Sequence, residues 1–470
     1  MDKTTQGLPF VFVQMLVVGA VAIASANLSA EGQERERVVV PPAEAPRLYD
    51  LINSVSAERI EADIRTLVDF GTRHTLSETE NDTRGIGAAR RWIYDEFLNI
   101  SQRCDNCLEV SYQRTTVPGQ AGTRIPVDTE IVNVIAILRG TTDPNRYVIM
   151  SGDIDNRISD PNNFTDDSPG ANDNASGMAG TIEAARVLSQ FAGSFSASIV
   201  FTGLSGEENG LLGGTHMAAV AREENWLIEA VINNDMIGNV EGIDGVIQNN
   251  AFRVFSEPTP VTETDTERRA RRFSGGEVDG VSRQLARYIS RITEHYIPNL
   301  QAKMIYRLDR FGRGGHHRPF NDAGYPAVRI METHENYRRQ HQDVRIEDGV
   351  QYGDLIDGVN FKYAAKLTGV NVASLASLAW APTPPTDVTI TGAVQPSTTL
   401  SWKRVDAANL AGYRVYWRDT TAPQWMQSRF VGKTTNYTFE NLVIDNYFFG
   451  VAAVGHDGNE SVVVFPSPQR

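Results

Sequence analysis

Apolar residues along residues 57–380 alternate between helix-like and strand-like patterns. Helices are expected in five segments, the first two from apolar side chains at every third or fourth position: 57–72, 85–100, 176–191, 211–223 and 281–297. Apolar runs typical of strands covered on both faces occur in five others: 130–138, 147–153, 197–205, 226–235 and 326–332. The helix over 176–191 is expected to begin at Ser176, a good N-cap. This alternation predicts an α/β fold, with helices on both faces of one sheet.

The pattern changes at a proline-rich linker, APTPPT, over residues 381–386. Beyond the linker, short stretches of alternating apolar and polar residues are separated by turn residues and show no helical spacing. Such regular short strands over about 85 residues are typical of a β-sandwich module. We therefore predict an α/β domain over 45–380 and a C-terminal all-β sandwich over 387–466.

The N-terminal segment has the composition of an export signal. Lys3 precedes an apolar run interrupted only by Gln14, and Ala24-Ser25-Ala26 then provides a cleavage pattern. Residues 1–30 are therefore predicted to be a signal peptide, and the mature protein to be secreted or periplasmic. An uncleaved N-terminal anchor is the alternative. No later segment has the length needed to span a bilayer.

Composition and charge exclude some classes of partner and site. The chain of 470 residues has 41 % hydrophobic and 22 % charged residues, which are ordinary globular values, and a formal net charge of −14. Nucleic acids and anionic membranes both need a basic surface, so neither is expected as a partner. The two cysteines, Cys104 and Cys107, are too few for a structural zinc site. In an oxidising compartment they are expected to form a local disulfide, with a redox-active pair as the alternative.

Carboxylates and one histidine recur where the predicted strands end. They are Asp153, Asp155, Asp173, Glu207, Glu208, Asp235 and His341. In an open α/β sheet, ligand sites gather beyond the carboxyl ends of the strands. So many carboxylates can converge only around bound cations, and one histidine among them suits a hard or borderline divalent metal. In the adjacent pair, one glutamate can bind metal while the other stays free as a base.

An ordered set of motifs carries a family resemblance. The motifs are PGANDNASG at 169–177, GEENGLLGG at 206–214, NNDMIG at 233–238 and QHQD at 340–343, together with FGTRHT at 70–75, NVIA at 133–136 and HRPFNDAGYPAV at 317–328. Through them, residues 50–378 resemble the M28 family of dinuclear zinc aminopeptidases. The C-terminal segment resembles a fibronectin type III module, with Trp402, Tyr413 and Val415 at its core positions.

The resemblance implies a mixed central sheet and a role for each matched residue. Asp173 would bridge two divalent metal ions, most simply zinc. Glu208 and His341 would complete one metal site, and Asp235 would help to hold the other. Glu207 would be the general base, which takes a proton from the attacking water and passes it to the leaving amine.

The chain departs from the family pattern at two places. Asp153 stands where the family usually has a histidine ligand, and a carboxylate there makes the second metal site harder and more anionic. Asp155 stands where the family has the aspartate that orients that histidine. The second site could then hold Mn²⁺, Mg²⁺ or Ca²⁺, or be empty in a single-metal enzyme. His316 stands where the family commonly has an aspartate: either a histidine has moved to the other side of the site, or His316 is an exposed loop residue. His317 and His316 are expected to line the substrate pocket.

These observations predict a secreted metal-dependent aminopeptidase that acts on peptides. A carboxypeptidase and a glutaminyl cyclase are alternatives on the same fold. An alternative of another class is a degenerate peptidase domain that serves as a binding or adhesion protein. The fibronectin-like module is expected either to pack on the catalytic domain or to bind an unknown partner.

Overall fold

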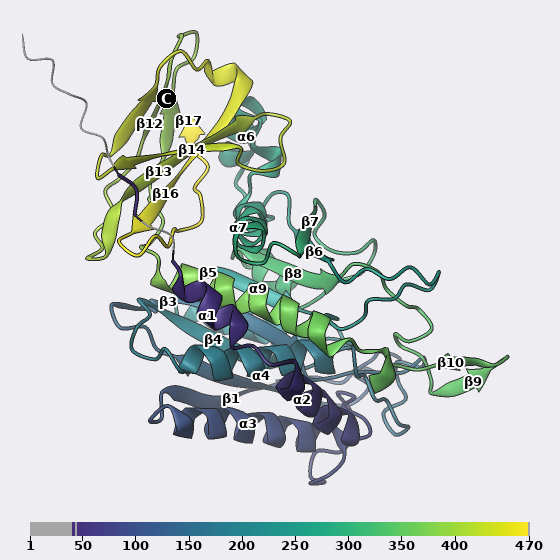
Figure 1. The fold of residues 1–470 in the computed structure, drawn as a ribbon. Coiled ribbons are helices and arrows are strands. Elements are labelled where there is room, and N and C mark those ends of the chain that lie inside the picture. The colour runs from purple at the N-terminus through teal and green to yellow at the C-terminus, as the bar shows by residue number, and fades with distance from the viewer. Residues whose placement is uncertain (1–39, 43–44, 469–470) are drawn as a thin grey trace, which may run out of the picture. The chain divides into compact units, whose positions relative to one another are not determined.

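A mixed eight-stranded sheet organises the larger part of the chain in the computed structural model, which describes residues 40–42 and 45–468 (Figure 1). The predicted signal segment 1–30 lies outside the described residues. In spatial order the strands are β1 (Leu108–Val117), β2 (Thr129–Leu138), β4 (Ala197–Leu204), β3 (Asp143–Asp153), β5 (Leu227–Asn234), β8 (Ala327–Glu332), β6 (Ala251–Ser256) and β7 (Gln301–Ile305). β4, β3, β5 and β8 are parallel neighbours, whereas β1–β2, β2–β4 and β6–β8 pair antiparallel. The predicted mixed sheet is thereby confirmed.

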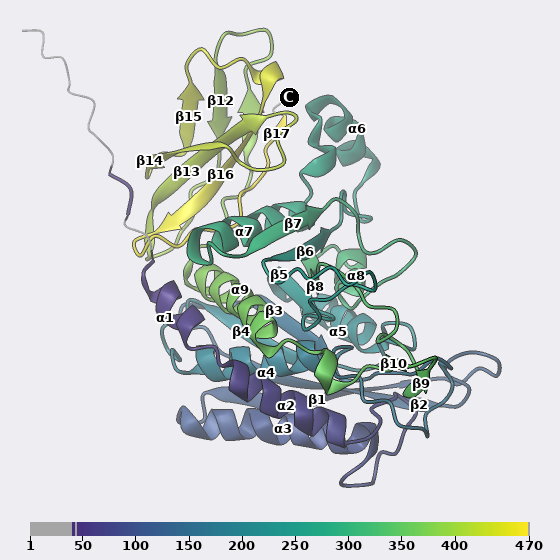
Figure 2. The same cartoon turned by 45° about the vertical axis from the view of Figure 1, so that its right-hand side comes forward.

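Helices cover both faces of this sheet. The α-helices of the described residues are, in chain order, α1 (Arg47–Asn53), α2 (Ala57–Asp69), α3 (Gly85–Arg103), α4 (Ala175–Ser189), α5 (Leu212–Glu223), α6 (Asp265–Ser274), α7 (Val281–Tyr296), α8 (His317–Asp322) and α9 (Phe361–Trp380). Helices α2, α3, α4 and α9 contribute to the larger core, and α5 and α8 to a smaller one (Figure 2). In β3, Val148 and Met150 face the larger core, while Ile149 between them faces the smaller, as the two-residue period of a strand requires.

Helix α4 begins earlier than predicted. Its N-cap is Asn174, whose side chain accepts a hydrogen bond from the Gly177 N–H. The expectation that Ser176 is the N-cap is wrong, because the Ser176 hydroxyl instead donates to the Asn172 carbonyl. Asp173 is consequently the last residue before the cap, so α4 and the preceding loop together fix its position.

Several elements carry no clear periodic pattern in the sequence. Helix α9 is buried along most of its length, so it lacks the polar stripe that marks an amphipathic helix. Strand β7 is exposed or half-buried at every position and lies at the edge of the sheet. A two-stranded hairpin, β9 (Arg345–Glu347) with β10 (Val350–Tyr352), follows the loop of residues 333–344.

The C-terminal segment forms two small sheets around its own core. One sheet is β15 (Asn436–Phe439), β12 (Thr398–Ser401), β11 (Thr389–Thr391) and β17 (Ser467–Pro468); the other is β14 (Gln427–Gly432), β13 (Leu410–Asp419) and β16 (Tyr447–Gly455). Trp402, Tyr413 and Val415 are all buried in the core between them, as predicted for the all-β sandwich. Within the described residues, no helix combines the length and apolar character that crossing a membrane requires.

A buried ion cluster links this module to the α/β domain. The Asp279 carboxylate, beside α7, accepts hydrogen bonds from Arg287 Nη1 at 2.9 Å and from Arg418 Nη2, on β13, at 2.7 and 2.8 Å. All three side chains are at most 1 % exposed. Arg287 Nε also donates to the Pro423 carbonyl at 2.8 Å, so the contact joins backbone as well as side chains.

Replacing Asp279 with alanine is expected to lower the free energy of unfolding by about 3–5 kcal/mol, because two buried guanidinium groups would lose their counter-charge. Denaturant titration followed by tryptophan fluorescence measures the change. Asp265→Ala is the control, because its ion pair with Arg268 is exposed and worth at most about 1 kcal/mol. Equal shifts of the denaturation midpoint in the two variants would contradict the expectation.

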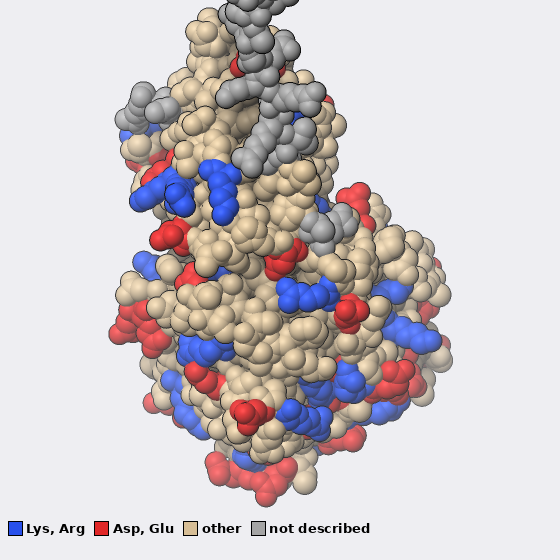
Figure 3. All heavy atoms as spheres, turned by 60° about the vertical axis from the view of Figure 1, so that its left-hand side comes forward, with Lys and Arg blue, Asp and Glu red and all other residues tan. Residues whose placement is uncertain are grey.

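Charge on the visible surface is distributed rather than concentrated. On the described part of the face in Figure 3, acidic and basic side chains are interspersed, and no continuous basic patch is visible. The absence of a nucleic-acid partner stays a prediction from composition.

Candidate active site

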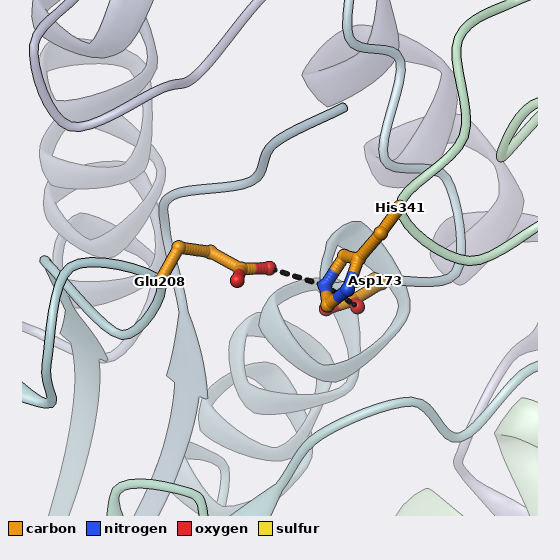
Figure 4. Close-up of side chains that lie close together, drawn as sticks. All are labelled: Asp173, Glu208 and His341. Atoms are coloured by element: carbon orange, nitrogen blue, oxygen red, sulfur yellow. Dashed lines mark hydrogen bonds and ion pairs between the residues drawn. The ribbon is translucent and has the colours of Figure 1, made fainter. Parts of the chain in front are cut away.

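Three predicted metal ligands converge at one edge of the sheet (Figure 4). His341 Nε2 lies 2.7 Å from Glu208 Oε1 and 3.0 Å from Asp173 Oδ2. Candidate ligand atoms of these three residues all lie within 4.8 Å of one another. Their side chains are 6–12 % exposed, so the cluster is largely screened from water.

The fold explains why residues so far apart in the sequence meet here. Asp173 lies in the loop between β3 and α4, Glu208 follows β4, and His341 follows β8. Because β3, β4 and β8 all run in the same direction, their carboxyl ends lie at the same edge of the sheet. The backbone of His341 has a φ of 53°, in the left-handed region that costs a residue with a Cβ about 1–2 kcal/mol. Strain of this kind is concentrated at functional sites.

Asp173, Glu208 and His341 fit a single divalent metal ion. Two carboxylates and one imidazole are a donor set that zinc accepts, leaving a fourth position for substrate or water. In a tetrahedral zinc site, ligand atoms lie roughly 3.3 Å apart, so the separations of His341 from Glu208 and from Asp173 need to widen by about 0.6 and 0.3 Å. Burial lowers the pKa of His341, but the Glu208 and Asp173 carboxylates outweigh burial and raise it to about 9. The cluster therefore attracts a cation, and a proton competes for that place.

Arg157, which the sequence analysis did not single out, orients His341. Its Nε donates to Glu208 Oε2 at 2.8 Å, and its Nη2 lies 2.6 Å from His341 Nδ1. A guanidinium group can only donate, so the Nδ1 of the neutral ring accepts and its Nε2–H donates to the two carboxylates. A zinc ion at Nε2 would take the place of that hydrogen, so the ring proton would have to lie on Nδ1 and the contact with Arg157 would have to open. The only sequence signal was the position of Arg157 in the acidic loop after β3.

Asp155 holds the backbone that carries the two glutamates. Its Oδ1 accepts from the Glu207 N–H at 3.0 Å, and its Oδ2 accepts from the Glu208 N–H at 3.1 Å and from the Thr75 hydroxyl at 3.0 Å. Asp155 therefore fixes the backbone position of both glutamates. Burial, followed by the negative charges of Glu208 and Asp235, raises the pKa of Glu207 well above its usual range. A raised pKa brings a carboxylate closer to the range in which it can exchange protons at neutral pH.

Asp354 holds the loop that presents Asp173, although no motif or spacing in the sequence marks it. Its carboxylate accepts from the Asn172 N–H at 2.9 and 3.0 Å and from the Asp173 N–H at 2.6 Å. All of these groups are buried. Both backbone donors would be left without a partner if the carboxylate were removed.

Replacing Asp354 with alanine is expected to weaken zinc binding about 10- to 100-fold, the usual cost of losing a group that supports a metal ligand. The zinc Kd is measured by competition with a chelating dye. Asp357→Ala removes an exposed carboxylate three residues further on and should leave the Kd unchanged. An Asp354→Ala protein that is folded and has the wild-type Kd would exclude the supporting role.

Asp153 is paired with His316. Its Oδ1 lies 2.6 Å from His316 Nδ1, and its Oδ2 accepts from Asn174 Nδ2 at 2.7 Å. His316 is 0 % exposed, so the interpretation of His316 as an exposed loop residue is wrong. Gly315 and His316 lead directly into the buried start of α8, and this position brings the His316 ring to Asp153. Burial raises the pKa of Asp153, and the nearby charge of Asp155 raises it further.

Asp235 is paired with a buried arginine that the sequence analysis also missed. Arg329 Nη2 lies 2.8 Å from Asp235 Oδ2, and Arg329 Nη1 lies 3.0 Å from Asp309 Oδ2. The Arg329 side chain is 0 % exposed. Arg329 stands in the middle of an apolar strand, PAVRIME. Such a pattern indicates a residue of the hydrophobic core rather than a partner in an ion pair.

The remaining predicted residues are His317 and the two cysteines. His317 Nε2 lies 3.6 Å from Asp309 Oδ2, the oxygen that also pairs with Arg329. His317 is buried, and its Nε2 lies 2.8 Å from the Leu308 carbonyl, so its place in a substrate pocket stays a prediction. Cys104 and Cys107 form a disulfide directly after α3, and the chain has no other cysteine. No thiolate is therefore available as a metal ligand.

Comparison with known proteins gives two family matches and close relatives. The model of peptidase family M28 matches residues 133–348, and that of the fibronectin type III domain matches residues 383–466. A probable zinc metalloprotease of Leptosphaeria maculans is 40 % identical over 431 residues, covering 92 % of this chain and 99 % of that protein. One of Pyrenophora teres f. teres is 40 % identical over 433 residues, covering 92 % and 89 %.

Among solved structures, the LapA aminopeptidase of Legionella pneumophila shares the fold. Its TM-score is 0.50 at 19 % identity, covering 71 % of this chain and 75 % of that one. The sequence relatives extend across both parts of the chain and agree with the family model. The chain therefore belongs to peptidase family M28 and carries a C-terminal fibronectin type III domain.

Proposed function

We propose that this protein is a secreted zinc-dependent aminopeptidase. The observation that carries the proposal is the convergence of Asp173, Glu208 and His341, with Glu207 adjacent in the chain and held by the same Asp155 carboxylate. Names of the relatives, probable zinc metalloproteases, support zinc as the ion.

Each residue of the site has a role in this proposal. Zinc held by Asp173, Glu208 and His341 would polarise the scissile carbonyl and increase the acidity of water. Glu207 accepts the proton of the attacking water and delivers it to the leaving amine nitrogen. Asp155 holds the backbone N–H groups of both Glu207 and Glu208.

Charge favours the N-terminal over the C-terminal end of a peptide. Asp153, Asp173 and Asp235 lie close enough to raise one another's pKa values or that of Glu207, so the site is strongly acidic. An acidic cavity attracts a substrate ammonium group and repels a carboxylate. Three arginines that act on the site, Arg157, Arg310 and Arg329, are each already paired with a protein carboxylate. The charge of the site therefore favours an aminopeptidase over a carboxypeptidase.

Peptides that differ only at their ends test the proposal. The protein is stripped with chelator and resupplied with zinc, and a pentapeptide is offered with a free or an acetylated N-terminus and with a free or an amidated C-terminus. We expect release of the first residue only from peptides with a free N-terminus. Release of the last residue would indicate a carboxypeptidase, and loss of ammonia from an N-terminal glutamine peptide a cyclase. No reaction from folded, metal-loaded protein would favour a binding role.

Export is the second part of the proposal. The disulfide between Cys104 and Cys107 is typical of an oxidising compartment. N-terminal sequencing of protein recovered from the medium should start shortly after Ala26. Retention in the membrane fraction with Met1 intact would indicate an anchor instead.

A further inference from the structure

The carboxylates expected to hold a second metal ion are engaged by other side chains. Asp235 Oδ2 forms an ion pair with Arg329 at 2.8 Å. Both oxygens of Asp153 already accept a hydrogen bond, one from His316 and one from Asn174. The third member of the expected second set, Asp173, accepts a hydrogen bond from Gln340 Nε2 at 3.2 Å and already belongs to the cluster with Glu208 and His341.

The spacing of the candidate ligand atoms also differs between the first and the second metal position. Across residues 40–42 and 45–468, a single group of three or more His, Cys, Asp or Glu side chains has its ligand atoms within 4.8 Å, namely Asp173, Glu208 and His341. Asp153, Asp173 and Asp235 do not form such a group. Metal ligands must lie about 2 Å from one ion, so atoms spread more widely cannot share it without rearrangement.

Arg329 cannot easily leave to admit an ion. Its Nη1 also donates to Asp309 at 3.0 and 3.1 Å and to the Gly314 carbonyl at 2.9 Å, and the side chain is fully buried. Moving it would break the buried ion pair with Asp309, and breaking a buried ion pair is strongly destabilising. A divalent ion bound to Asp235 would also lie beside a fixed positive charge.

We propose that this protein binds one catalytic metal ion per chain, and that Arg329, together with His316, takes the place of the second. The inference rests on the proposed function, because it assumes that the cluster of Asp173, Glu208 and His341 binds zinc. Arg329 and His316 are positioning residues in this account: they hold Asp235 and Asp153 and do not touch substrate.

Counting metal ions tests the inference independently of catalysis. Chelator-stripped protein is incubated with excess zinc, freed of unbound metal by gel filtration, and measured by inductively coupled plasma mass spectrometry against protein concentration. We expect one zinc per chain in the wild type and in Asp235→Asn and Asp153→Asn, and none in Asp173→Ala. The two asparagine variants keep the shape of the side chain, and circular dichroism confirms that each variant is folded.

The outcomes separate the two proposals. Two ions per chain, with a fall to one in Asp235→Asn, would overturn the inference while leaving the metallopeptidase intact. No bound ion, or an ion that Asp173→Ala does not remove, would overturn the proposed metal site as well. Arg329→Met adds a direct test: if it folds, the freed Asp235 should raise the count above one or leave it at one, but never lower it, and a count of zero would show that Arg329 supports the first ion instead.

Discussion

Replacing Glu207 with glutamine is expected to reduce kcat by about 10²–10⁴-fold while leaving the zinc content unchanged. Glutamine has the same shape but cannot accept a proton, so the attacking water loses its base and the leaving amine its acid. Glu207 is not a member of the ligand cluster, whose carboxylate on this loop comes from Glu208. The test is steady-state hydrolysis of an aminoacyl amide, with zinc counted on the same sample.

A control variant separates the loss of the base from damage to the site. Glu223→Gln, at the exposed end of α5, makes the same chemical change away from the cluster and should keep wild-type kcat. Asp155 holds the Glu207 N–H rather than its side chain, so Glu207→Gln should leave the loop in place. A kcat within tenfold of wild type would exclude Glu207 as the base. Loss of zinc together with activity would indicate that Glu207 is a ligand.

Replacing His341 with alanine is expected to weaken zinc binding more than about 100-fold and to abolish peptidase activity. Removing a group that only supports a ligand costs 10- to 100-fold, and removing the ligand itself should cost more. The variant also tests the pH dependence. Because the pKa of His341 is raised to about 9, its proton must be displaced by zinc, and wild-type affinity should fall by up to about tenfold per pH unit as pH decreases below 9.

The measurement is the zinc Kd at pH 6, 7 and 8 for both proteins. In His341→Ala the part of the slope that comes from this imidazole should disappear. His334→Ala is the control, since His334 contacts Gln248 and is not part of the cluster. If His341→Ala binds zinc with the wild-type Kd and slope, the ion is held elsewhere.

The sequence determined those features that depend on local pattern. The apolar runs that became β2, β3, β4, β5 and β8 are recognisable because strands covered on both faces need apolar side chains at successive positions. The acids after these runs were expected at one edge, because parallel strands end on the same side of a sheet. Asp173, Glu208 and His341 accordingly meet there.

Partnerships over long sequence distances were decided only by the tertiary structure. His316 and Asp153 are 163 residues apart, His341 and Arg157 are 184 apart, and Asp354 lies 181 residues from Asp173. No spacing rule connects such pairs, because each depends on how the strands are ordered in space. Arg329 is the sharpest case, since its position within an apolar strand indicates core packing.

The sequence therefore established the family, the sheet and the residues available for one metal ion. Tertiary structure decided which carboxylates lie close enough together to share it. Asp173 and Glu208 converge with His341, whereas Arg329 and His316 compete with an ion for Asp235 Oδ2 and Asp153 Oδ1. That competition depends on distances between side chains, which the order of residues along the chain does not contain.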